Sequence, residues 1–124
     1  MAQHFDLVVR GGTVVTSVSH DHADIGIVGS HIVEISNLSG AKAEHTIDAR
    51  GLHVLPGIID SQVHFREPGL EHKENLASGT AAAALGGVCT IFEMPNTFPA
   101  TTTAETLADK LARADGRSWT DYAF

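Results

Sequence analysis

Hydrophobic and polar residues alternate in short runs along residues 1–53, and small turn-forming residues separate the runs. Gly11-Gly12 stands between the first two runs, and Gly29-Ser30 stands between the next two. A two-residue loop of this kind between alternating runs indicates a β-hairpin. The pattern therefore predicts a small antiparallel sheet with one buried face. The runs expected to form its strands are 5–10, 13–16, 23–28, 31–35, 46–49 and 52–55.

The pattern changes at Pro56-Gly57, after which extended and helix-forming segments follow one another. The first helix is predicted from a run of alanines, which Gly86-Gly87 ends. The second is predicted to begin at a capping box formed by Thr102 and Glu105. The elements predicted after Pro56 are strands at 58–65, 88–94 and 119–124 and helices at 74–85 and 102–114.

The order strand, helix, strand, helix, strand is typical of an α/β domain built on a parallel sheet. A closed parallel barrel of the TIM type needs about 250 residues, whereas the chain has 124. We therefore expect the chain to be part of a longer molecule, with residues 54–124 as the first strands and helices of an incomplete barrel. Such a segment exposes apolar strand and helix faces, so we also expect it to associate into homo-oligomers.

Composition and charge narrow the class of protein. Apolar residues make up 43% of the chain and charged residues 19%, which is typical of a globular protein. The formal net charge of −7 and the scattered lysines and arginines exclude a nucleic-acid partner. Residues 1–10 lack the plan of a signal peptide, and no apolar stretch reaches the roughly 20 residues that span a bilayer. The only cysteine, Cys89, excludes an internal disulfide and predicts a buried, inert thiol. We expect a cytoplasmic protein with no membrane partner.

Polar side chains gather where two of the predicted strands end. In a regular strand Gln62, His64 and Arg66 lie on one face, and Asp60 shares it. Asn96 follows the end of the next strand along the chain. Because ligands bind at the carboxyl ends of parallel strands in α/β folds, we expect these side chains to meet at one cavity. The arginine could bind a carboxylate through two parallel hydrogen bonds, and the asparagine amide could donate and accept.

Four linked motifs in this order resemble the dihydroorotase branch of the amidohydrolase superfamily. The motifs are LPGIID (55–60), VHFREPG (63–69), HKE (72–74) and EMPNT (93–97). The resemblance implies a small β-sandwich, here part of it in residues 1–53, beside a TIM-type barrel. It also implies hydrolysis of a small carboxylated cyclic amide, the reversible conversion of dihydroorotate to carbamoyl aspartate in pyrimidine synthesis.

By the same resemblance, His64 binds metal in a centre of one or two zinc ions, which activates a water molecule and polarises the carbonyl group. Arg66 and Asn96 then hold the substrate carboxylate. Apart from the resemblance, Asp60 could orient the metal-binding strand. The family's remaining ligands, a carboxylated lysine and two histidines, and its catalytic aspartate are expected beyond Phe124. No catalytic residue is therefore assigned within this chain.

Gln62 departs from the family pattern, because it replaces the first histidine of a His-x-His pair. A glutamine carbonyl is a weaker zinc ligand than an imidazole, so Gln62 is a doubtful ligand. The substitution keeps open a non-catalytic homologue, the kind that is a structural partner of aspartate transcarbamoylase. A hydantoinase, dihydropyrimidinase or allantoinase is a further alternative.

Structural interpretations of the same residues also remain open. His64 could be a hydrogen-bonded histidine at a strand end, and Asn96 a turn residue. Arg66 could form an ion pair with Glu67 or Glu71. Glu93 stands in an apolar run and needs a partner, for which Lys73 and Arg66 are the candidates.

Overall fold

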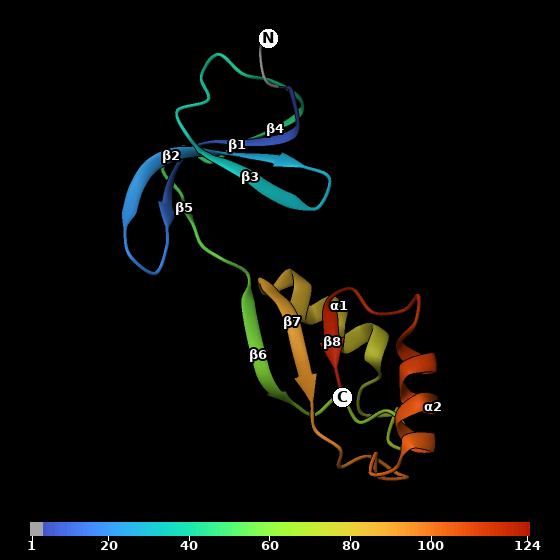
Figure 1. The fold of residues 1–124 in the computed structure, drawn as a ribbon. Coiled ribbons are helices and arrows are strands. Elements are labelled where there is room, and N and C mark those ends of the chain that lie inside the picture. The colour runs from blue at the N-terminus through green and yellow to red at the C-terminus, as the bar shows by residue number, and fades with distance from the viewer. Residues whose placement is uncertain (1–3) are drawn as a thin grey trace. The chain divides into compact units, whose positions relative to one another are not determined.

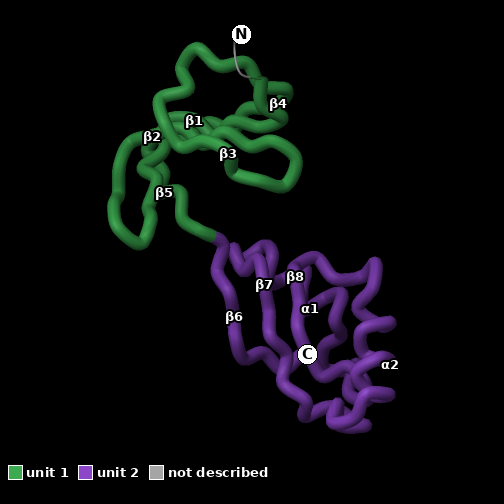
Figure 2. The backbone as a smooth tube through the Cα atoms, in the orientation of Figure 1, with its two compact units in different colours: residues 1–56 green, residues 57–124 purple. Residues whose placement is uncertain are grey.

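The computed structural model describes residues 4–124, so the first three residues of the predicted 1–53 domain lie outside the described part. The chain divides into two compact units, Met1–Pro56 and Gly57–Phe124 (Figure 2). Each unit has its own sheet and its own buried cluster of hydrophobic side chains. Among the described residues no helix has the length and the apolar character that a membrane crossing requires.

The first unit is a five-stranded sheet of order β3-β2-β1-β4, with β5 also paired to β1 (Figure 1). Its antiparallel pairs are β1 with β2 and β2 with β3, whereas β4 and β5 run parallel to β1. The prediction of an antiparallel sheet is therefore wrong for β4 and β5, which reach β1 by connections rather than by tight turns. The strands are β1 (His4–Val15), β2 (His20–Val28), β3 (His31–Ser36), β4 (Lys42–Asp48) and β5 (His53–Val54).

Gly11-Gly12 is not a hairpin turn, which corrects the sequence prediction. Strand β1 continues through both glycines with an irregular register between Val9 and Gly12. A Cβ atom on Gly12 would lie 2.7 Å from the Cγ2 atom of Val54, so glycine allows close packing here. The turn into β2 instead begins at Thr16, whose Oγ1 atom accepts hydrogen bonds from the next backbone amides.

The Gly29-Ser30 hairpin is confirmed, because β2 and β3 pair antiparallel across it. Gly29 has φ +58°, and its N–H donates to the Asp6 carboxylate at 2.6 Å. Phe5 is completely buried against the same strands, where a Cβ atom on Gly26 would overlap its ring. The fully or almost fully buried side chains of this unit include Phe5, Val8 and Leu38.

The second unit is a parallel sheet of order β6-β7-β8 with two connecting helices. In Figure 1 helix α1 lies behind β7 and β8, and α2 lies beside α1. The predicted sequence of elements and the α/β class are confirmed. The elements are β6 (Ile58–Val63), α1 (Leu76–Leu85), β7 (Val88–Glu93), α2 (Ala104–Ala114) and β8 (Asp121–Ala123).

The helix starts differ from the predicted ones. Helix α1 is capped by Asn75, whose side chain accepts from the Ser78 N–H at 2.9 Å. Helix α2 is capped by Thr103 with Thr106 as its capping-box partner, one residue later than the predicted Thr102 and Glu105. The difference arises because Thr101, Thr102 and Thr103 offer the same hydroxyl in succession. Both helices end where glycines follow, as predicted.

The cluster beneath the second sheet holds Phe65, Leu76, Ile91 and Ala114. On the sheet itself several large side chains stay exposed, among them Ile59 at 61% and Phe92 at 42%. Cys89 is exposed as well, so the prediction of a buried thiol is wrong. Its strand is apolar as predicted, but within residues 57–124 no layer covers these side chains.

Candidate active site

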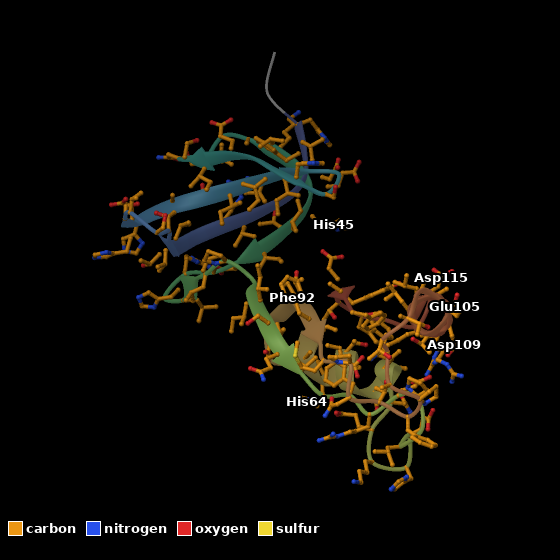
Figure 3. All side chains as sticks on the ribbon, turned by 60° about the horizontal axis from the view of Figure 1, so that its bottom comes forward. His45, His64, Phe92, Glu105, Asp109 and Asp115 are labelled. Atoms are coloured by element: carbon orange, nitrogen blue, oxygen red, sulfur yellow. The ribbon has the colours of Figure 1, made fainter. Side chains whose placement is uncertain are left out.

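Strands β6 and β7 bring His64 and Asn96 into contact just beyond their carboxyl ends. The last backbone bond between the strands runs from the Met94 N–H to the Val63 carbonyl oxygen at 3.0 Å. The next residues then approach through their side chains, with the His64 Nδ1 atom 2.8 Å from the Asn96 Oδ1 atom. Figure 3 labels His64 at this end of β6. His64 and Asn96 are thus in direct side-chain contact although they lie 32 positions apart in the chain.

This contact assigns a distinct role to each ring and amide atom. An amide oxygen only accepts hydrogen bonds, so the Nδ1 atom of His64 carries the proton and donates it. The Nε2 atom then keeps a free lone pair, which suits a metal ion or a proton donor. The Asn96 amide group keeps its two N–H donors for an acceptor. The pair therefore presents one basic nitrogen and one donor group side by side.

Arg66 occupies a strained backbone position next to this pair. Its φ of +63° makes it the one described non-glycine residue with a positive φ, at a cost of about 1–2 kcal/mol for an L-residue. No ion pair joins Arg66 to Glu67 or Glu71 within the described residues. The ion pair with Glu67 or Glu71, which was the structural alternative for Arg66, is therefore not formed among the described residues.

No side-chain contact joins Gln62 or Asp60 to His64 among the described residues. The register between β6 and β7 is irregular between Asp60 and Val63, so the shared face expected from strict alternation stays a prediction. The Asp60 carboxylate instead accepts from the Gln62 backbone N–H at 3.1 Å, and both side chains are exposed. The one side-chain partner of His64 among residues 4–124 is Asn96, so neither Gln62 nor Asp60 is joined to it.

Two buried carboxylates support the loop that carries His64 and Arg66. Glu93 accepts from the Phe65 N–H at 3.1 Å, and its other oxygen lies 2.8 Å from the Nζ atom of Lys110, with both side chains 0% exposed. The partner of Glu93 is thus neither Lys73 nor Arg66. Burial raises the pKa of Glu93 above its usual range, although Lys110 and the Phe65 amide oppose this shift.

Glu67 is the second buried carboxylate. It accepts from the Leu76 N–H at 2.9 Å and from both terminal nitrogens of Arg117 at 2.8 and 3.1 Å. Burial alone would raise the pKa of Glu67, but these hydrogen bonds outweigh it and lower the pKa. Sequence reasoning missed both carboxylate pairs, because their partners lie on or after helix α2.

Replacing Glu67 with glutamine is expected to lower the free energy of unfolding by about 1–3 kcal/mol at pH 7, since a hydrogen-bonded charged group is lost. A lowered folded-state pKa means that this stability exists above the unfolded-state pKa of 4.5 and disappears as the pH falls through the lower folded-state value. Urea unfolding of both chains from pH 7 to pH 3 measures the difference. A difference that stays constant over this range would contradict the assignment.

Of the residues brought together here, His64 could serve as a ligand of a metal ion. Metal-bound histidines usually donate their second ring N–H to an oxygen, as the His64 Nδ1 atom does to Asn96. The described residues nevertheless contain no group of three or more histidine, cysteine, aspartate or glutamate side chains placed to hold a metal ion. Residues 4–124 therefore fit one ligand position of a zinc centre, but do not form a complete one.

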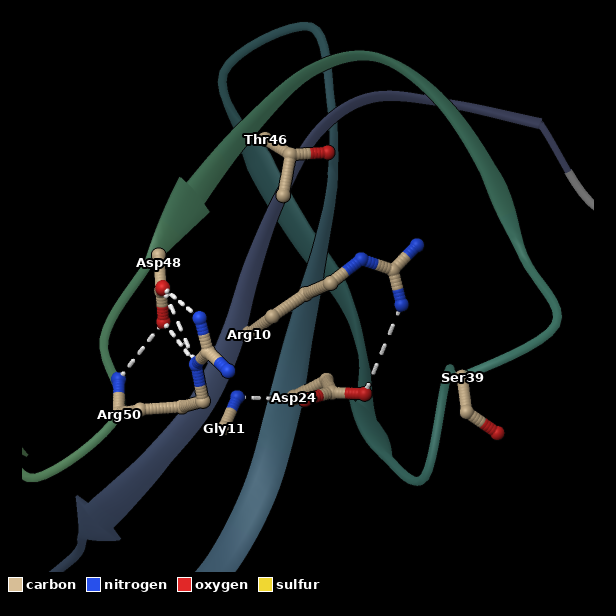
Figure 4. A pocket seen from close by; sticks show the side chains of 7 residues that line it. All are labelled: Arg10, Gly11, Asp24, Ser39, Thr46, Asp48 and Arg50. Atoms are coloured by element: carbon tan, nitrogen blue, oxygen red, sulfur yellow. Dashed lines mark hydrogen bonds and ion pairs between the residues drawn. The ribbon is translucent and has the colours of Figure 1, made fainter.

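A polar hollow in the first unit is a structural network rather than a second candidate (Figure 4). Its Arg10 guanidinium donates to the carbonyl oxygens of Leu38 and Ala41, and Arg50 pairs with Asp48. The Arg50 hydrogen bonds lower the pKa of Asp48 to about 2. The charges of its two arginines and two aspartates cancel, and these side chains form hydrogen bonds and ion pairs with groups of the same unit. The lining residues are Arg10, Gly11, Asp24, Ser39, Thr46, Asp48 and Arg50.

Comparison with known proteins identifies relatives of the chain in sequence and in fold. The family model described as Dihydro-orotase-like matches residues 51–119. The chain is 47% identical over 120 residues to the allantoinase of Rubrobacter xylanophilus and 40% identical over 118 residues to that of Deinococcus radiodurans, covering 96% and 94% of this chain. The L-hydantoinase (dihydropyrimidinase) of Arthrobacter aurescens has the same fold over 96% of this chain, with a TM-score of 0.90 and 36% identity.

These relatives are much longer than the chain. It spans 26% of each allantoinase and 27% of the hydantoinase. Their names refer to allantoin and hydantoin rather than to dihydroorotate, so the specific expectation of a dihydroorotase is not confirmed. The broader expectation of a cyclic amidase relationship is confirmed.

Proposed function

We propose that the protein carrying this chain hydrolyses a ring amide of the allantoin or hydantoin class. The premise is that this chain belongs to the dihydroorotase-like, cyclic-amidase branch of the amidohydrolase superfamily. One observation carries the proposal beyond family membership. The 2.8 Å contact of His64 with Asn96 puts a basic nitrogen and an amide donor at the carboxyl ends of parallel strands, where α/β enzymes bind their ligands. In this proposal residues 57–124 are the first units of a TIM-type barrel, and residues 1–56 belong to a small β-sandwich.

In this proposal His64 contributes its Nε2 lone pair as one ligand of a metal centre, and the other ligands lie outside residues 4–124. Zinc, when bound, supplies an activated water and polarises the ring carbonyl group. Asn96 has a separate role, in which its free N–H groups donate to an oxygen of the substrate and orient it. Through Nδ1, His64 holds the Asn96 oxygen away from the substrate, so that only donors face it.

Dihydroorotate is a second candidate substrate, and Arg66 is the observation that favours it. Its guanidinium group forms no ion pair with the neighbouring Glu67 or Glu71. A guanidinium group and an amide donor that face one substrate would together match a carboxylate, which dihydroorotate carries. A substrate without a carboxylate would leave Arg66 unpaired once the site closes, at a cost of about 1–3 kcal/mol.

A substrate panel with Arg66→Ala separates the two candidates. The natural polypeptide that carries these residues is loaded with Zn²⁺ and assayed with allantoin, hydantoin and dihydroorotate. If the arginine holds a carboxylate, its removal raises KM for dihydroorotate by about 10–100-fold, the equivalent of 1–3 kcal/mol, and leaves allantoin and hydantoin nearly unchanged. Absence of hydrolysis of all three compounds by the zinc-loaded protein would contradict the proposed function.

The non-catalytic homologue remains a prediction that rests on Gln62. Metal analysis of the natural polypeptide addresses it, with Gln62→His as the matched variant. If Gln62 weakens a ligand position, the histidine variant holds zinc more tightly than the wild type. Two tightly held zinc ions in the wild type would count against a non-catalytic protein and against the assigned effect of Gln62.

A further inference from the structure

The hydrogen-bond ladder between β6 and β7 continues beyond the last backbone pair through a side chain. Met94 N–H donates to the Val63 carbonyl oxygen, which ends the backbone ladder. Two residues further along, the Phe65 N–H has no strand carbonyl to meet and donates to the Glu93 carboxylate at 3.1 Å. Glu93 thus serves as the next acceptor of the ladder, and it ties the end of β6 to the strand that carries Asn96.

The bond at Phe65 lies inside the segment that presents the candidate site. His64 precedes Phe65 and Arg66 follows it, so one backbone amide fixes the position from which both side chains leave the chain. The Phe65 ring is almost fully buried against Gly79 of α1, where a Cβ atom would lie 2.7 Å from it. The ring and the amide of Phe65 are therefore both held, one by the core and the other by Glu93.

Lys110 fixes the carboxylate that makes this bond. Its Nζ atom lies 2.8 Å from the second Glu93 oxygen, and the ammonium group stands 4.9 Å from the centre of the Phe124 ring. The Nζ and Oε2 atoms do not meet with hydrogen-bond geometry, so their attraction is mainly electrostatic. A buried charge pair is costly to assemble. Two leucine side chains in place of Glu93 and Lys110 would fill the same space without charge. Neither apolar side chain would accept a bond from Phe65.

We propose that Glu93 is a positioning residue, which sets the His64–Asn96 contact by accepting the Phe65 N–H, and that Lys110 serves to hold the Glu93 carboxylate in place. The catalytic meaning of this role rests on the function proposed above, because the contact matters for hydrolysis only if His64 and Asn96 face a substrate. The geometric role itself is testable without substrate, in the natural polypeptide that carries these residues.

Three double variants separate the effect of the hydrogen bond from the effect of the charge pair. Glu93→Gln with Lys110→Met removes both charges and keeps a carbonyl oxygen for Phe65. Glu93→Leu with Lys110→Met also removes both charges but offers no acceptor. Glu93→Met with Lys110→Met is a second variant without a good acceptor, in case the leucine chain does not fold. Each chain is labelled with ¹⁵N, and the Phe65 amide exchange rate and the His64 ring nitrogen shifts are recorded.

The glutamine variant is expected to keep the wild-type His64 ring shifts and a protected Phe65 amide. In the leucine or methionine variant the Phe65 amide exchanges at least about tenfold faster, the equivalent of one lost hydrogen bond, and the His64 shifts move toward those of a free imidazole. Wild-type His64 shifts in every double variant would overturn the proposal, because Glu93 would then be only half of a core ion pair. If the variants behave as expected and the substrate panel shows no hydrolysis, the proposed function fails and the positioning role of Glu93 stands.

Discussion

Lys110→Met is expected to lower the free energy of unfolding of the chain by about 3–5 kcal/mol, because it leaves the buried Glu93 carboxylate without its counter-charge. Neither side chain is exposed, and the Nζ and Oε2 atoms lie 2.8 Å apart. Methionine fills a similar volume, so the loss reports the missing charge rather than a cavity. Urea unfolding followed by circular dichroism at pH 7 measures it.

Two controls define this result. Adding Glu93→Gln to Lys110→Met removes the unpaired negative charge of the Glu93 carboxylate and is expected to recover most of the lost free energy of unfolding. Arg50→Met makes the same kind of change in the exposed Asp48–Arg50 pair and is expected to have no measurable effect. The Lys110→Met deficit should shrink on acidification, because the raised pKa of Glu93 favours its neutral form. A small deficit at pH 7 that does not change with pH would contradict the buried pair.

Gly69→Ala is expected to reduce the activity of the natural polypeptide by about 100-fold, since a displacement of about 1 Å at a site can have that effect. Gly69 has φ +98°, and an added Cβ atom would overlap the Phe98 carbonyl oxygen and lie 2.7 Å from the Phe98 Cβ atom. The Phe98 N–H donates to the Pro68 carbonyl oxygen at 2.9 Å, so the loop after Arg66 is docked on the loop after Asn96. Alanine would push these two loops apart.

Gly87→Ala is the matched control for this experiment. Gly87 has φ +86°, and no heavy atom lies within 4 Å of its added Cβ atom. It therefore carries a comparable backbone cost without the overlap. Steady-state kinetics on the substrate that the panel identifies, with unfolding curves for both variants, separate the loop displacement from general instability. Equal losses of activity in the two variants would show that the backbone conformation, and not the docking of the loops, is responsible.

The sequence predicts the second unit better than the first for a physical reason. Between Gly57 and Phe124 an alanine run, a threonine-rich cap and apolar strand runs bounded by glycine or proline mark the elements, and these local signals suffice. In the first unit Gly11-Gly12 carries a hairpin signal but serves the close packing of Gly12 against Val54. That packing depends on a strand about 40 residues away, which no local pattern records.

The candidate site is predictable only in part. His64 and Asn96 each follow an apolar strand, and the rule that parallel strands end at one edge brings them together. Their support could not be predicted in this way, because Lys110 lies on an amphipathic helix where a lysine normally faces solvent. The partner of Glu93 was not found by separation along the chain, because Lys110 is 17 positions from it and the candidates Lys73 and Arg66 are 20 and 27 positions away. The face that Gln62 was expected to share with His64 depends on strict alternation, and an irregular register such as the one between Asp60 and Val63 cannot be predicted from the local pattern.

The proposed site depends most directly on the contact between His64 and Asn96. A long-range ¹H–¹⁵N spectrum of the His64 ring in the natural polypeptide that carries these residues tests this contact. We expect the proton on Nδ1, because the Asn96 oxygen accepts it at 2.8 Å. In Asn96→Ala the ring should shift toward the tautomer mixture of an exposed histidine. A His64 ring protonated at Nε2, with shifts that Asn96→Ala leaves unchanged, would contradict the convergence of the two strand ends and with it the proposed site.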